Sequence, residues 1–387
     1  MKPAPIYLDH AASTPVRDEV FEAMRPYFSA RFGNPSSTHR WGREARVALD
    51  EARERVAACL GARADEVCFT SGGTEGDNLA ILGIWRHARA AGRNAIVTTP
   101  IEHKAILGAV HQAAAEGAAE RFLDVDSNGV VTFESFDEQV RDDVAVCSII
   151  WVNNEIGTVQ PLPELAEKAK ARGAVVHTDA VQAFGKVAIN AASQAFDLLS
   201  ISGHKIGAPK GIGALFIRRG TQLQPLIHGG AQDRGRRPGT ENVPYAVGLA
   251  TAAEITISEH ERETSRLRKM RDRLELAILA ALPDAVIHGQ GAERAPHVLN
   301  ISVPGTDSES LLMALDLRGI AASGGSACQS GSISPSHVLV AMGVRPDLAS
   351  AAIRMSIGCL TTDECIDRVA EVFPALVNKA RQFSTAG

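Results

Sequence analysis

Residues 197–217 read DLLSISGHKIGAPKGIGALFI, two apolar runs on either side of a glycine-rich turn. The runs at 197–201 and 213–217 have the length and composition of buried strands, and the turn between them carries Lys205. Further strand-length apolar runs occur at 66–70, 95–99, 144–152 and 174–178, and helical patterns separate them at 43–60, 102–116 and 162–172. This alternation predicts an α/β fold in which helices cover a largely parallel sheet.

The pattern changes in the last third of the chain. A long helical stretch, roughly 245–282, ends at Pro283, and after it short strands at 297–303 and 353–357 flank helices at 307–318, 335–342 and 363–381. We interpret this part as a smaller α/β domain. The predicted division assigns 16–258 to a large cofactor-binding domain, and 1–15 with 259–387 to the small domain.

Composition excludes several classes of function. The chain has 387 residues and a net charge of −5, which argues against nucleic acid or an anionic membrane as the main partner. No apolar run approaches the ~18 residues of a membrane span, and the N-terminus, MKPAPIYLDHAAS, lacks a signal core. We therefore expect a cytoplasmic protein. The six cysteines form no CxxC and no zinc-type spacing, so a metal site is not expected.

Three predicted strands are followed by side chains suited to chemistry. Residues 71–78, SGGTEGDN, place glycines and Thr74 at a helix start, which favours an anion such as phosphate. Asp179 and Gln182 follow the run at 174–178, where Asp179 could also be a helix N-cap. Lys205 and His204 follow 197–201, where a lysine can form a Schiff base. Pyridoxal phosphate needs an anion site, an acid at its ring nitrogen and such a lysine, so the three features together predict this cofactor.

Cys328 stands apart from the other cysteines. It lies in SGGSACQSG, residues 323–331, among glycines, serines and an alanine that cannot bury it. We interpret it as a reactive thiol on a loop that moves. In contrast, Cys68 and Cys147 lie in apolar strand-like runs and are expected to be buried and inert.

The chain resembles the cysteine desulfurases of the NifS/IscS type, pyridoxal-phosphate enzymes of the class V aminotransferase family. The resemblance runs nearly end to end, through YLDHAASTP, FGNPSSTH, TSGGTEGDN, IEHKA, WVNNEIGTVQ, HTDAVQ, SGHKIGAPKGIG, RPGTENV, GGSAC, PSHVLVAMG and IRMSIG. It implies the fold type I of pyridoxal-phosphate-dependent transferases, with a large, mostly parallel-sheet domain and a smaller α/β domain. It also implies a homodimer.

The resemblance assigns a role to individual residues. Lys205 would hold the cofactor and move protons, with His103 against the ring face as an acid or base. The other implied cofactor contacts are Asp179 at the ring nitrogen, Gln182 at the ring hydroxyl, Gly73, Thr74, Ser202 and His204 at the phosphate, Thr240 at the same phosphate from the other subunit, and Asn154. Asn154 and Arg354 would bind the substrate carboxylate, for which an arginine offers a bidentate fork. Purely structural roles stay open as alternatives: His103 could cap a helix, Arg354 could form an interdomain ion pair, and Asn154 could be a turn residue.

The implied reaction converts L-cysteine to L-alanine and leaves a persulfide on Cys328. The loop at about 323–334 would then carry the sulfur to an iron–sulfur scaffold or another acceptor protein, with Cys328 a candidate cluster ligand during transfer. Residue Cys359, after IRMSIG, is expected to be a buried spectator, with a second thiol near the site as the alternative. The alternatives are a selenocysteine lyase, which uses the same cofactor, and a catalytically silent scaffold subunit.

Overall fold

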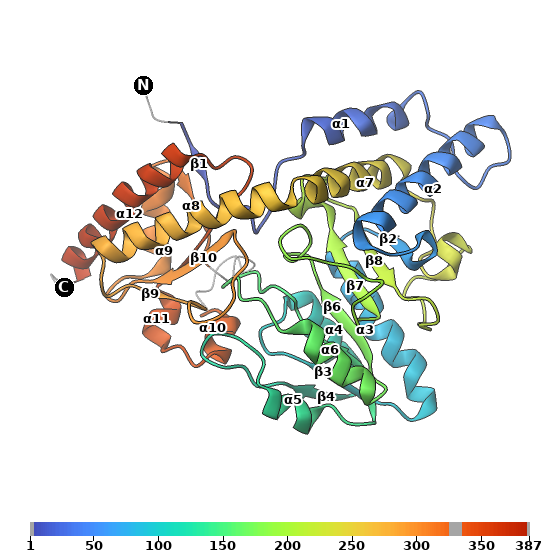
Figure 1. The fold of residues 1–387 in the computed structure, drawn as a ribbon, viewed down its shortest axis with the longest axis horizontal. Coiled ribbons are helices and arrows are strands. Elements are labelled where there is room, and N and C mark those ends of the chain that lie inside the picture. Colours follow the sequence, from blue (N-terminus) through green and yellow to red (C-terminus); the bar gives the residue numbers. More distant parts are fainter. Residues whose placement is uncertain (1–3, 325–334, 385–387) are drawn as a thin grey trace.

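The computed structural model describes residues 4–324 and 335–384. Its largest element is a seven-stranded sheet, in the middle of the larger body in Figure 1. The strands are β2 (Val67–Thr70), β3 (Ala95–Thr98), β4 (Ala119–Phe122), β5 (Val144–Ser148), β6 (Val175–Asp179), β7 (Leu198–Ser202) and β8 (Gly213–Ile217). Six of them match predicted runs to within a few residues.

The sheet order is β2-β8-β7-β6-β5-β3-β4. Strand β8 is antiparallel to both of its neighbours, and all other pairs are parallel. The largely parallel sheet is thus confirmed. The sequence analysis missed β4, whose residues AERF are half-buried or exposed at the edge and give no apolar run.

Helices cover both faces of this sheet, which explains why its central strands β5, β6 and β7 are buried along almost their whole length. Alternate strand residues point to opposite faces: Ile96 and Val146 pack in one apolar cluster, and Val97 and Cys147 in another. One face is covered by α3 (Gly73–Ala88) and α4 (Lys104–Ala115). The other is covered by α1 (Asp18–Met24), α2 (Arg40–Leu60), α5 (Phe133–Gln139), α6 (Leu162–Ala171) and α7 (Val243–Ser258).

Helix α2 shows how local sequence sets an element. Its buried residues, which include Ala45, Leu49 and Val56, recur at helical spacing on one face. The helix ends at Gly61, whose φ of 63° is the left-handed conformation that glycine adopts without steric cost.

A smaller body contains an antiparallel sheet of order β12-β10-β9. Its elements are α8 (His260–Ala281), β9 (Val286–Ile287), β10 (Val298–Ser302), α9 (Ser308–Leu317), β11 (Ile320–Ala321), α10 (His337–Ala341), α11 (Pro346–Ser350), β12 (Ala352–Ser356) and α12 (Asp363–Ser384). Helices α8, α9 and α12 pack an apolar cluster against one face of this sheet. Arg354 lies on β12 between two members of that cluster, Ile353 and Met355, so its side chain belongs to the opposite face.

The beginning of the chain joins this smaller body. Strand β1 (Ile6–Tyr7) pairs with β11, and Leu8 packs in the cluster of the smaller body. The predicted single helix at 245–282 is two helices in sequence, α7 and α8, which meet at Glu259 and run from one body to the other (Figure 1). We propose the division 16–258 against 1–15 and 259–387, since its boundary falls at this helix junction.

Candidate active site

A cavity of about 370 Å³ lies at the carboxyl ends of the parallel strands. Loops after β2, β3, β5, β6 and β7 all contribute to its wall, as expected for a ligand site in an α/β sheet. Of the predicted site residues, ten line it: Gly73, Thr74, His103, Asn154, Asp179, Gln182, Ser202, His204, Lys205 and Arg354. Ala11 also lines the cavity, so segments up to 343 residues apart in sequence, at Ala11 and Arg354, meet here.

Lys205 ends the short 3-10 turn Gly203–Lys205 that directly follows β7. Its ammonium donates hydrogen bonds to the carbonyl oxygens of Ala11, at 2.5 Å, and Ala12, at 2.8 Å. These carbonyls come from the N-terminal segment, which thereby holds the lysine at the cavity wall.

The start of α3 offers an anion-binding end. No side chain caps the helix, so the amides of its first turn at Gly73 and Thr74 and the positive end of its dipole face the cavity wall. A Cβ at Gly73 would lie 2.8 Å from Val181 Cγ2, so only glycine fits there. Ser202 and His204 line the same cavity, and burial, followed by the charges of Lys205 and Lys210, lowers the pKa of His204 to about 4.

Asp179 ends β6 and is only 4 % exposed. Its Oδ1 accepts the amide of Val181 at 2.8 Å, and no helix follows, so the N-cap alternative is wrong. One ligand atom each of Asp179, Asp77 and His103 lies within 4.8 Å of the others. A cationic ring nitrogen bound beside Asp179 would neutralise this cluster.

Two buried carboxyls so close together cannot both carry a charge. Burial raises the pKa of both, and the charge of Asp179 raises that of Asp77 further, to well above its ordinary value. Only Asp179 has His103, the Val181 amide and Lys205 to favour its anion. Asp77 therefore holds the proton of the pair and Asp179 its charge.

His103 is both a site residue and a cap. Its Nδ1 accepts the amide of Ala105 at 3.2 Å as the N-cap of α4, so the capping alternative describes a real contact. This bond leaves Nε2 as the nitrogen that can hold or release a proton at the cavity.

Arg354 is held by two contacts. It donates to the carbonyl of Asn154 at 3.0 Å and to Asp9 Oδ1 at 2.8 Å. Asp9 lies in the N-terminal segment that joins the smaller body, so this ion pair lies within one predicted domain and is not the interdomain pair of the alternative. The Nε of Arg354 is buried and has no hydrogen-bond partner in the described part of the chain. Asn153 and Asn154 stand at a turn, where Asn153 Oδ1 accepts two amides, so the turn alternative describes a real feature.

Three other cysteine and loop predictions have different outcomes. Cys328 lies outside the described residues. Thr240 is exposed on a loop and does not line this cavity, and its role at another subunit stays a prediction. Cys359 is exposed, so the expectation of a buried spectator is wrong, whereas Cys68 and Cys147 are buried as predicted.

The sequence analysis missed several site residues. Asp77 stands four residues after Gly73, one helical turn along α3, and that spacing could have revealed it. The Ala11 and Ala12 carbonyls gave no signal, because a backbone contact does not depend on side-chain type. Glu102, beside His103, is fully buried and accepts the Ile150 amide and the Thr99 hydroxyl through Oε1.

Glu102 should make stability depend on pH. Burial raises its pKa from 4.5 to about 8, so ionisation destabilises the fold as the pH rises through that interval. We expect Glu102→Gln to increase the melting temperature by several degrees more at pH 8 than at pH 5. Differential scanning fluorimetry at both pH values tests this, with the exposed Glu167→Gln as control. An equal shift of the Glu102 variant at both pH values would contradict it.

The comparisons with known proteins agree with this geometry. The family model Aminotransferase class-V matches residues 6–369. The chain is 43% identical to "Cysteine desulfurase IscS" of Dictyoglomus turgidum, over 98% of this chain and 96% of that protein, and 44% identical to "Cysteine desulfurase NifS" of Azotobacter vinelandii, over 98% and 94%.

Solved structures give the same result. A "NifS-like protein" superposes with a TM-score of 0.90 at 35% identity, covering 97% of this chain and all of that one. "SspA in complex with cysteine" has a TM-score of 0.81 at 34% identity, covering 91% and 98%. Among the described helices, none is long and apolar enough to cross a membrane. The chain belongs to the class V aminotransferases, in the group of the NifS and IscS cysteine desulfurases.

Proposed function

We propose that this protein is a pyridoxal-phosphate-dependent cysteine desulfurase, a sulfurtransferase that converts L-cysteine to L-alanine and leaves the sulfur as a persulfide on Cys328. The observation that carries the proposal is the meeting of Lys205, Asp179 and the uncapped start of α3 in one cavity. Its volume, about 370 Å³, lies within the range of roughly 300–1,000 Å³ typical of cofactor sites.

The residues of the cavity fit each end of this cofactor. The amides at Gly73 and Thr74 with Ser202 and His204 would hold the phosphate, and Asp179 the protonated ring nitrogen. When bound, pyridoxal phosphate supplies an aldehyde for attachment to lysine and a cationic ring that withdraws electrons from the substrate. Asp179 keeps that ring nitrogen protonated, because it is the charged member of its pair with Asp77.

Other residues of the chain would bind and protonate the substrate. Arg354 and Asn154 line the cavity and suit the carboxylate of L-cysteine. Lys205 and Nε2 of His103 lie in the same cavity and can move protons there. We further propose a homodimer in which Thr240 completes the phosphate site of the other subunit. The acceptor would be an iron–sulfur scaffold or another protein that receives sulfur.

The test uses the purified protein with L-cysteine and no reductant. We expect stoichiometric alanine and one added sulfur atom on the Cys328 peptide by mass spectrometry. Both should be lost in Cys328→Ala and kept in Cys359→Ala, which removes another exposed thiol. Alanine formation that persists in Cys328→Ala would contradict the role of this thiol. Activity with selenocysteine alone would identify a selenocysteine lyase. Absence of activity with both amino acids would identify a catalytically silent subunit.

A further inference from the structure

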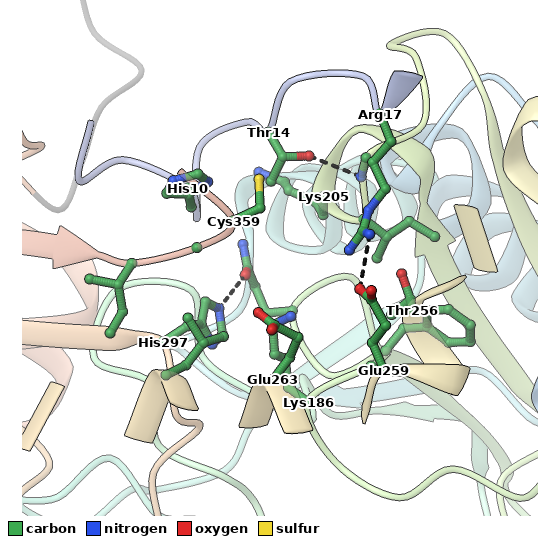
Figure 2. Close-up of a pocket in the computed structure, with 18 of the residues that line it drawn as sticks. His10, Thr14, Arg17, Lys186, Lys205, Thr256, Glu259, Glu263, His297 and Cys359 are labelled. Carbon is green, nitrogen blue, oxygen red and sulfur yellow. Dashed lines mark hydrogen bonds and ion pairs between the residues drawn. The ribbon is translucent and has the colours of Figure 1, made fainter. Parts of the chain in front are cut away.

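A second, smaller cavity of about 70 Å³ lies behind the active site. Gln182, Val181 and Lys205 line both cavities and so form the wall between them. Figure 2 shows the smaller cavity, with His297 on one side. The dashed line at His297 marks its hydrogen bond with Gln182. This wall contains Gln182, whose orientation can be derived from its partners.

The amide of Gln182 has one possible orientation. A nitrogen must face the carbonyl of Ala11, 2.8 Å away, because a carbonyl oxygen only accepts hydrogen bonds. The amide oxygen, Oε1, then faces Nε2 of His297 at 3.0 Å. Since Oε1 also only accepts, His297 must carry its proton on Nε2 and donate it.

His297 cannot easily leave this state. It is 3 % exposed, and burial, followed by the charges of Lys186 and Arg354 and then by His10 and Arg271, holds its pKa well below the ordinary value. The ring is therefore neutral and has one proton. Its Nδ1 has no hydrogen-bond partner among the described residues, so no protein group competes for the proton at that end.

We propose that His297 is a positioning residue: by donating to Oε1 it fixes the Gln182 amide with one N–H on Ala11 and leaves the other for the larger cavity. This inference rests on the proposed function and on the contact between Gln182 and the ring hydroxyl that the resemblance implies. Without the donor at Nε2, the Ala11 carbonyl alone would hold the amide, and its second N–H would no longer be held toward the ring oxygen.

The consequence concerns the pH at which the visible spectrum of the bound cofactor would change. An N–H directed at the ring oxygen would withdraw electron density from the ring. A proton between that oxygen and the nitrogen of Lys205 would then be held less strongly. Losing that N–H should therefore raise the pH at which the visible spectrum titrates. Because a hydrogen bond to a charged group is involved, we expect a shift of about one pH unit.

The experiment titrates the visible spectrum of cofactor-loaded His297→Leu, which removes the donor, and His297→Gln, which keeps an N–H. The control is His288→Leu, which alters another buried histidine. His288 lies 2.7 Å from Ser302 Oγ, to which it is hydrogen-bonded, and it lines neither cavity. We expect an upward shift in His297→Leu, substantial restoration in His297→Gln and none in His288→Leu. An unshifted His297→Leu, or an equal shift in both leucine variants, would overturn the proposal.

A measurement on the wild-type protein covers the case in which His297→Leu does not fold. Nitrogen-15 NMR of histidine-labelled protein, with His297 assigned from His297→Gln, should show its proton on Nε2. A proton on Nδ1 would overturn the proposal. Failure of the wild-type protein to bind pyridoxal phosphate would instead contradict the proposed function, and the NMR result would still decide whether His297 donates to Gln182.

Discussion

Replacing Lys205 with alanine is expected to lower alanine formation from L-cysteine by at least about a thousandfold. The lysine has two tasks in the proposed reaction, to hold the cofactor and to move a proton. Among the residues that the structure describes, the other lysine at the cavity wall is Lys104. Single-turnover assays with added pyridoxal phosphate measure the loss. Borohydride trapping followed by mass spectrometry should find the cofactor on Lys205 in the wild-type protein.

Lys210→Ala is the matched control for this experiment. Lys210 lies in the same glycine-rich turn but is exposed and lines neither cavity. It should keep wild-type activity and the trapped cofactor. A loss of less than tenfold in Lys205→Ala would show that the lysine is not the attachment point.

Asp179→Asn should lower the rate by roughly a hundredfold to a thousandfold. Asparagine has nearly the same shape and its Oδ1 can still accept the Val181 amide, so the fold should persist. It lacks the negative charge that keeps a ring nitrogen protonated. Burial, the largest cause of the raised pKa of Asp77, persists in this variant and disfavours a replacement charge on Asp77. The turnover number, corrected for bound cofactor, measures the effect.

Asp197→Asn controls for loss of a buried carboxylate. Asp197 precedes β7, at the end opposite Lys205, and contacts Lys170 and the amide of Val176. Its replacement should reduce stability while the rate of the folded, cofactor-loaded enzyme is unchanged. Equal rate losses in both variants would indicate a general structural effect instead of a charge at the ring.

The central sheet could be predicted because its signal is local. Strands such as β5 are buried on both faces, so four of its five residues are apolar and the run is visible without knowledge of its neighbours. The edge strand β4 and the two-residue strands β1, β9 and β11 carry no such run. Their pairing depends on contacts with distant segments, which a pattern along the chain does not contain.

The candidate site divides in the same way. Residues that directly follow strands, such as Asp179 and Lys205, could be located from the alternation of elements. The partners that orient them could not. Ala11 holds both Lys205 and Gln182 through a backbone carbonyl, and His297 reaches Gln182 from a point 115 residues away. The sequence shows the reactive groups, while contacts that form only in the folded chain determine their orientation and which of their atoms carry protons.

The contacts of the N-terminal segment also bear on how the protein is made. Residues 9–12 leave the ribosome long before their partners, because Asp9 must wait for Arg354, 345 residues later, and β1 must wait for β11. At about 5–20 residues per second, this delay is roughly 20–70 s. The larger sheet can form meanwhile, whereas the wall that holds Lys205 is secured only after Arg354 has been synthesised. A nascent chain is thus kept from acquiring the proposed catalytic lysine in its final setting until the smaller body has been made.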